Sequence, residues 1–147
     1  MKSTITGTLD HILFLARHLD KCNERGAVVA MLMELGAPTQ CVGFEFLKTA
    51  ILLFYENPTR SLHKDIFREV MHRYEQNSEE QVDQAVREVI KKSWRHGSQE
   101  AWDWYFAYNG VHRTERPSNA EFISRIARVL ELWQSNCKEV AYEKAKY

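Results

Sequence analysis

Apolar residues recur at spacings of three and four along most of the chain, which is the pattern of amphipathic helices. Two such patterns, over about residues 61–74 and 78–96, are separated only by a short polar break at residues 75–78. Ser78 is followed three residues later by Gln81, and this capping box marks the start of the second helix. Two helices joined so closely predict a helix-turn-helix. The apolar positions are Leu62, Ile66, Phe67, Val70, Met71 and Tyr74 in the first helix and Val82, Ala85, Val86, Val89 and Trp94 in the second.

Helical patterns also precede this pair. Residues 9–19 and 28–35 carry two amphipathic stripes, and Gly36 is the predicted C-terminal cap of the second. Residues 44–55 have almost no polar face, which is typical of a helix surrounded by others, and this helix should stop before Pro58. We therefore expect residues 44–55 to form the central core helix.

After the pair, we expect a short aromatic helix capped by Ser98 and a last helix opened by a second capping box, Ser118 with Glu121. The sequence thus predicts an all-α fold, a compact bundle of six to seven helices that contains the helix-turn-helix and has an extra N-terminal helix. The expected organisation is an N-terminal helical extension at 1–22, a helix-turn-helix domain at 23–135 and a tail at 136–147.

Composition does not alter the predicted fold, but it excludes several classes of protein and site. Twenty Lys and Arg balance twenty Asp and Glu, so a charged partner must meet a local patch. Cys22, Cys41 and Cys137 are odd in number and widely spaced, which indicates free thiols rather than a disulfide framework or a zinc site. No apolar run is long enough to span a bilayer and no signal peptide is recognisable. We expect a cytoplasmic protein with no membrane association.

Enzymatic chemistry is not indicated. His11 and His18 share one predicted helix face, and His63 and His72 flank the first helix of the pair without carboxylates in metal-ligand register. Glycine-rich phosphate loops, nucleophile elbows and paired-carboxylate spacings do not occur. We expect no catalysis, no metal and no cofactor, with these histidines on the surface.

Five blocks of sequence resemble the C-terminal DNA-binding domain of the stage-zero sporulation protein A family, the response regulator of endospore formation. The blocks lie between about Val28 and Trp133, in the family's order; they are Glu34-Leu35-Gly36-Ala37-Pro38, Gly43-Phe44-Glu45-Phe46-Leu47, Val82-Asp83-Gln84-Ala85-Val86-Arg87, Trp94-Arg95-His96-Gly97 and Arg116-Pro117-Ser118-Asn119-Ala120-Glu121-Phe122. The resemblance implies a six-helix domain whose fourth helix enters the major groove of double-stranded DNA at a short specific box. It also implies binding to tandem sites as dimers.

Two departures from the family accompany this resemblance. Only about 27 residues precede the match, so we expect no receiver domain and no control by phosphorylation in cis. In the recognition helix the family has a Glu-Arg pair followed by a second Arg, whereas this chain has Asp83-Gln84 and then Arg87. Residues 79–88 contain four acids and one base, a net charge of −3 that opposes the approach of phosphates.

The candidate DNA contacts fall into two sets. For base reading, Arg87 would prefer guanine, Gln84 adenine, and Asp83 would accept from the amino group of cytosine. For phosphate binding, the candidates are Lys91, Lys92, Arg95, Arg113 and Arg116, the last two in the loop where the family has lysines near the backbone. The target should therefore differ from the family's box in at least one position.

Other interpretations remain open. Asp83 with Arg87 and Glu88 with Lys92 have the spacing of ion pairs on a solvated helix face. Trp94 has the spacing of a core residue, whereas Trp102 and Trp104 could be core, stack on bases or line a small-ligand pocket. The acidic helix start favours an alternative function, a protein-interaction module that pairs with or antagonises a full-length regulator. A homodimer through the N-terminal or the C-terminal helix would cover exposed apolar stripes.

Overall fold

The computed structural model describes residues 23–107 and 110–146, without the side chains of 138–146. These residues are folded into helices with no strands, as the sequence predicted: α2 (Glu24–Glu34), α3 (Val42–Glu56), the π-helical turn η1 (Leu62–Phe67), α4 (Arg68–Arg73), α5 (Glu79–His96), α6 (Gln99–Phe106) and α7 (Asn119–Lys146). The N-terminal extension at 1–22, with Cys22, His11 and His18, lies outside the described residues.

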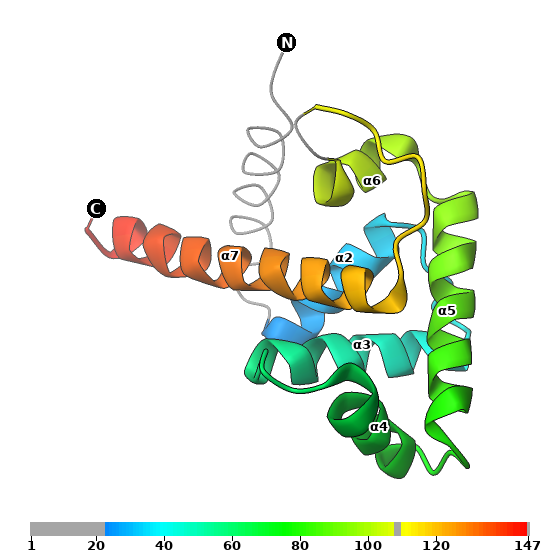
Figure 1. The fold of residues 1–147 in the computed structure, drawn as a ribbon. Helices are drawn as coiled ribbons and strands as arrows, with labels where there is room; N and C mark the ends of the chain where they lie inside the picture. Colours follow the sequence, from blue (N-terminus) through cyan, green and yellow to red (C-terminus); the bar gives the residue numbers. More distant parts are fainter. Residues whose placement is uncertain (1–22, 108–109, 147) are drawn as a thin grey trace.

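The central helix is α3, and it packs against α2, η1, α4, α5 and α7. Its residues Phe46, Leu47, Ala50 and Ile51 are at most 1% exposed, as expected of a helix with almost no polar face. Helix α3 runs alongside α7, and α5 stands across the N-terminal ends of both (Figure 1). One continuous hydrophobic core joins these helices to α2 and α6, so α5 has a single buried side.

Local capping signals give most helix ends. Leu35 closes α2, Gly36 adopts a left-handed φ of 82°, and the backbone N–H groups of Gly36 and Ala37 bond to the carbonyls of Met33 and Leu32. This is the Schellman arrangement, in which glycine avoids the steric cost of the left-handed conformation. Ser98 caps α6 through the Ala101 N–H, as predicted.

The last helix opens with the predicted reciprocal capping box. The Glu121 N–H donates to Ser118 Oγ over 3.1 Å, and the Ser118 N–H donates to Glu121 Oε1 over 3.4 Å. Two orphan amides are satisfied in this way, so the chain enters α7 in a defined direction.

The first helix of the predicted pair differs from an ordinary α-helix. Its first turn, η1, is π-helical, with the N–H of Ile66 bonded to the carbonyl of Ser61. The same carbonyl also accepts from the N–H of Asp65, whose carboxylate in turn accepts from the Ser61 N–H over 2.9 Å. This local network accompanies the wider turn, and the adjacent Ile66 and Phe67 are both fully buried.

The turn between α4 and α5 uses a strained residue. Glu75 adopts a left-handed φ of 55°, and the N–H groups of Glu75 and Gln76 bond back to the carbonyls of His72 and Met71. The geometry matches that at Gly36, but here a residue with a side chain bears the steric cost.

Candidate nucleic-acid interface

Helix α5 is amphipathic, and its polar face is open. Val82, Val86, Val89, Ile90 and Ser93 are buried, as the apolar spacing predicted. The opposite face presents exposed side chains; these are Glu80, Gln81, Gln84, Arg87, Lys92 and Arg95. The helix therefore has a continuous outer surface that the described residues leave uncovered.

The start of α5 is capped in a slightly different way from the prediction. Ser78 Oγ accepts from the Gln81 N–H over 3.2 Å, as expected. The Gln81 side chain, however, accepts from the N–H of Asn77 over 3.1 Å rather than from Ser78. Both bonds still satisfy backbone amides at the turn, so the start of the helix is fixed by Ser78.

The far end of α5 is held by close backbone packing. Ser93 Oγ donates to the carbonyl of Leu35 over 2.6 Å, and Trp102 Nε1 donates to the carbonyl of Ser93 over 3.2 Å. A Cβ atom on Gly97 would lie 2.2 Å from the oxygen of Leu35, so only glycine fits at that contact. Two of the sequence blocks, around Gly36 and Gly97, therefore meet at the C-terminal end of α5.

The three candidate base-reading residues form one network on the outer face of α5. Arg87 Nη2 donates to Asp83 Oδ2 over 2.8 Å, which is the predicted ion pair, and Arg87 Nη1 donates to Gln84 Oε1 over 3.2 Å. Gln84 Nε2 donates to Glu88 over 3.2 Å, so Glu88 pairs with Gln84 rather than with Lys92. The Arg87 side chain is 50% exposed and that of Asp83 only 17%, so Arg87 faces solvent while Asp83 lies against the protein.

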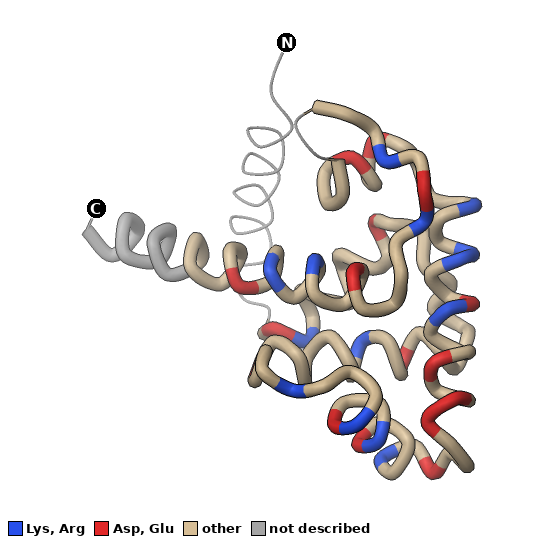
Figure 2. The backbone as a smooth tube through the Cα atoms, viewed as in Figure 1, with Lys and Arg blue, Asp and Glu red and all other residues tan. Residues whose placement is uncertain are grey.

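The candidate phosphate-binding residues on α5 form a basic band toward its C-terminal end (Figure 2). Lys92 and Arg95 are exposed, Lys91 is half-buried, and Lys92 Nζ lies 3.7 Å from the sulfur of Cys41. Three of the four acids of the same helix, Glu79, Glu80 and Asp83, lie in its N-terminal half, and Glu88 lies at its middle (Figure 2). Charge is thus separated along the helix rather than spread over it.

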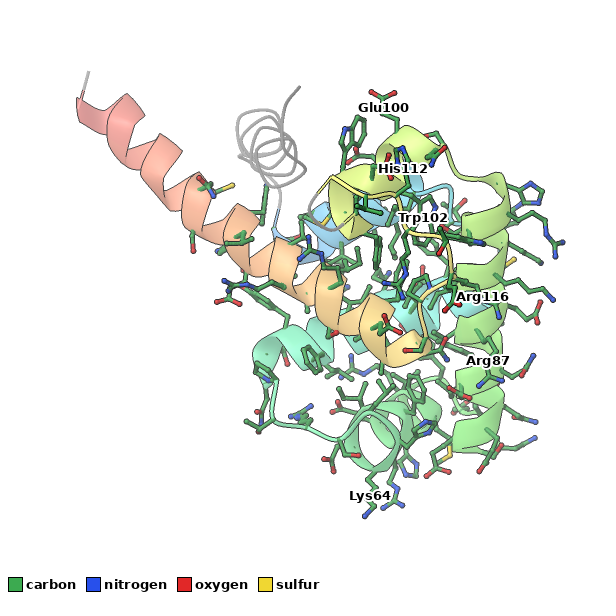
Figure 3. The ribbon with its side chains drawn as sticks, turned by 45° about the horizontal axis from the view of Figure 1, so that its top comes forward. Lys64, Arg87, Glu100, Trp102, His112 and Arg116 are labelled. Carbon is green, nitrogen blue, oxygen red and sulfur yellow. The ribbon has the colours of Figure 1, made fainter. Side chains whose placement is uncertain are left out.

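The two arginines of the loop before α7 lie in different settings. Arg113 donates to the carbonyl of Glu115 over 2.7 Å and to Glu121 Oε2 over 2.6 Å. That contact, together with the N–H of Ser118, holds the pKa of Glu121 below its usual range. Arg116 is exposed and lines a pocket of ≈530 Å³ together with Arg87. Figure 3 shows Arg87 and Arg116 on the same side of the molecule, on α5 and on the loop beside it.

Sequence reasoning missed the cations of η1 and α4. Lys64 and Arg68 are exposed there, and Arg68 Nε donates to Glu79 Oε1 over 3.2 Å at the start of α5. The backbone N–H of Glu79 and this arginine hold the pKa of Glu79 below its usual range. The first helix of a helix-turn-helix crosses the DNA backbone, so its basic residues were the available signal.

The tryptophans belong mainly to the core. Trp102 is 5% exposed, and Trp94 packs against it edge to face with ring centroids 5.0 Å apart. Trp104 is half-buried against the same core. Beside Trp94 and Trp102 lies a pocket of ≈260 Å³, which is below the range of roughly 300–1,000 Å³ that is typical of small-ligand sites.

Among residues 23–107 and 110–137, no group of three or more His, Cys, Asp or Glu side chains is arranged to hold a metal ion. His63 and His72 are exposed, as predicted. In the part of the chain that the structure describes, no helix is both long and apolar enough to cross a membrane.

The chain matches a model of a known protein family. The model described as sporulation initiation factor Spo0A C terminal matches residues 28–130, which is more than two thirds of the chain. This family represents the DNA-binding effector domain of a sporulation regulator. The match spans α2 to the middle of α7 and includes every candidate contact residue named above. The chain therefore belongs to the family of the sporulation initiation factor Spo0A C-terminal domain.

Proposed function

We propose that this protein is a sequence-specific DNA-binding transcription regulator whose helix α5 enters the major groove. The observation that carries the proposal is the position of Arg87, half exposed on the outer face of α5 in a pocket that it shares with Arg116. Protein–DNA interfaces combine side chains that read base edges, of which arginine at guanine is the commonest, with cations that contact the phosphates. The proposal also places the protein in the cytoplasm, where the duplex is accessible.

In this proposal Arg87 reads guanine and Gln84 reads adenine. A guanidinium has five N–H groups. In Arg87, two of them donate to Asp83 and Gln84, so three remain to donate to a base. The amide of Gln84 would have to exchange its bonds to Arg87 and Glu88 for bonds to a base. Both partners are charged, and bonds to charged groups typically contribute about 1.5–3 kcal/mol, but these bonds are exposed to solvent and a base would replace them with new ones. The oxygens of Asp83 already accept from Arg87 and Asn119, so an amino group of cytosine would have to reach one of the remaining lone pairs of a side chain that is only 17% exposed.

Phosphate contacts would come from Lys91, Lys92 and Arg95 on α5 and from Arg113 and Arg116 in the loop before α7. Lys and Arg at phosphates supply essentially all the non-specific affinity of such proteins. Arg116 is exposed, whereas Arg113 is paired with Glu121 and would contact a phosphate only with N–H groups that Glu121 leaves unused. Lys64 and Arg68 would add contacts from the first helix of the pair.

The test is a fluorescence anisotropy titration at low and rising salt. The probes are a duplex with the family's box, its single-position variants and a random duplex of equal length. Arg87→Ala should reduce the preference for the best box by about 5- to 150-fold, which corresponds to one lost bidentate contact. Arg116→Ala should weaken all duplexes alike and reduce the salt slope by about one.

Arg128→Ala is the matched control, because Arg128 is equally exposed but lies on α7, where it pairs with Glu131 over 3.0 Å. The Arg128→Ala variant should bind every duplex with the affinity of the wild type. A wild type that shows no preference among the duplexes, or an Arg87→Ala variant that keeps the preference, would refute the proposal.

The second candidate is a protein-interaction module that pairs with or antagonises a full-length regulator. The net charge of −3 over residues 79–88 favours it. It predicts that the wild type binds none of the duplexes even at low salt, and that adding it lowers the DNA binding of a full-length regulator. A homodimer through the C-terminal helix is a further proposal, tested by light scattering of the full chain.

A further inference from the structure

Asn119, the first residue of α7, uses its side chain on a different helix. Its Nδ2 donates to Asp83 Oδ1 over 2.7 Å and to the backbone carbonyl of Asp83 over 3.0 Å, although the two residues are 36 positions apart. Capping of α7 is done by Ser118 instead, through the Glu121 N–H. The amide of Asn119 is therefore committed to α5.

The carboxylate of Asp83 links Asn119 to Arg87. One carboxylate oxygen accepts from Asn119 and the other accepts from Arg87 Nη2 over 2.8 Å. All three residues line the pocket of ≈530 Å³ that Arg116 also lines. The side chain of Arg87 is thus linked to the start of α7 through the carboxylate of Asp83, which lies against the protein.

We infer that Asn119 is a positioning residue that fixes the guanidinium of Arg87 through Asp83 and so sets the base preference of the protein. The inference rests on the proposed function. A carboxylate held by Asn119 has one orientation, and an arginine bonded to it has lost much of its rotamer freedom before DNA arrives. Pre-organising one such side chain improves affinity for the matching base by roughly two- to tenfold.

A purely structural role makes a different prediction. The bond from Asn119 to the backbone carbonyl of Asp83 staples α7 to α5 whatever the side chain at position 83. If stapling were the whole role, removing Asn119 would lower the thermal midpoint and the affinity for all duplexes together. It would not alter the ratio between guanine and other bases at one position.

The test uses Asn119→Ala and Asp83→Asn in the full chain. Asp83→Asn keeps an amide oxygen for Asn119 but removes the negative charge that holds Arg87. Two readouts are needed: the ¹⁵N order parameter of the Arg87 Nε–H without DNA, and the discrimination between guanine and adenine at the position that Arg87 reads. Both variants should lower the order parameter and reduce discrimination by roughly two- to tenfold. In an Arg87→Ala background, Asn119→Ala should cause no further loss of discrimination.

An unchanged order parameter in folded Asn119→Ala would overturn the inference whatever Asp83→Asn shows, as would an equal loss of discrimination in the Arg87→Ala background. If Asn119→Ala does not fold, Asn119→Asp takes its place, because a carboxylate cannot donate to Asp83. A wild type that shows no base preference, with the order parameter falling in the variants, would refute the proposed function and leave the positioning of Arg87 supported. The two failures are therefore distinguishable.

Discussion

Replacing Gly43 by alanine tests how closely α3 approaches the proposed recognition helix. Gly43 is the second residue of α3, and helix propensity alone predicts that alanine there adds up to about 1 kcal/mol of stability. The structure predicts the opposite sign. A Cβ at Gly43 would lie 2.3 Å from the carbonyl oxygen of Ala85 and 2.7 Å from Val89 Cγ2, both on α5.

The size of the effect follows from that distance. Ordinary contact for a Cβ begins at 3.4 Å, so the backbone of α5 would have to move by about 1 Å. Overpacking typically costs about 1–3 kcal/mol, and an approach of 2.3 Å to backbone belongs to the upper part of that range, about 2–3 kcal/mol, which exceeds the gain of up to about 1 kcal/mol from propensity. The net loss of about 1–2 kcal/mol should lower the thermal midpoint by roughly 3–8 °C in a domain of this size.

Thermal and urea unfolding followed by circular dichroism measure this change. Val42→Ala is the control, because Val42 is the preceding residue in the same turn and is 61% exposed, so it should change stability by less than about 0.5 kcal/mol. A Gly43→Ala variant as stable as the wild type, or more stable, would refute the close approach of α3 to α5. The displaced α5 should also bind duplexes more weakly than in the control.

Three further predictions concern the turn, the charge and the pH. Glu75→Gly should raise stability by about 1 kcal/mol because it relieves the left-handed φ of 55°, whereas Glu75→Ala should not; equal melting points would contradict this. Glu88→Gln should strengthen binding to specific and random duplexes alike, measured by anisotropy, and an unchanged affinity would show that this charge is irrelevant to phosphates. The folded-state pKa of Glu121 lies below its usual value of 4.5, so its contribution to stability is present above that pH and is lost as the pH falls through the folded-state pKa. The urea midpoint should therefore fall with acidification below about pH 4.5, and less steeply in Arg113→Ala; parallel profiles would exclude that pair as the cause.

Sequence reasoning predicted features that depend on neighbouring residues. Gly36, Ser98 and Ser118 cap helices as expected, because a cap is a contact within one turn. The central helix was predicted at residues 44–55 and runs from Val42 to Glu56, since its apolar content is itself the signal. Such caps can be predicted from the sequence because the capping residue and the backbone group that it contacts are only a few residues apart.

Contacts between distant residues were not predicted. Asn119 and Asp83 are 36 positions apart, and the pattern of either helix gives no hint that the amide meets the carboxylate.

Two local features were also missed. The π-helical turn at Leu62–Phe67 was not predicted because its apolar spacing fits an α-helix equally well. Gln81 reaches Asn77 rather than Ser78, a choice between neighbouring amides that only the folded turn decides.

The negative charge of the proposed recognition helix, α5, is partly neutralised in the fold. Of the four acids at residues 79–88, Glu79 is paired with Arg68 from the preceding helix and Asp83 with Arg87. Arg68 lies outside that window, and including it changes the local net charge from −3 to −2. The N-terminal end of α5 also carries the positive end of its helix dipole, which favours phosphate in the same region. Glu80 and Glu88 are then the acids that phosphates would meet without a cationic partner among the described residues, so the balance between DNA binding and its loss depends mainly on these two side chains.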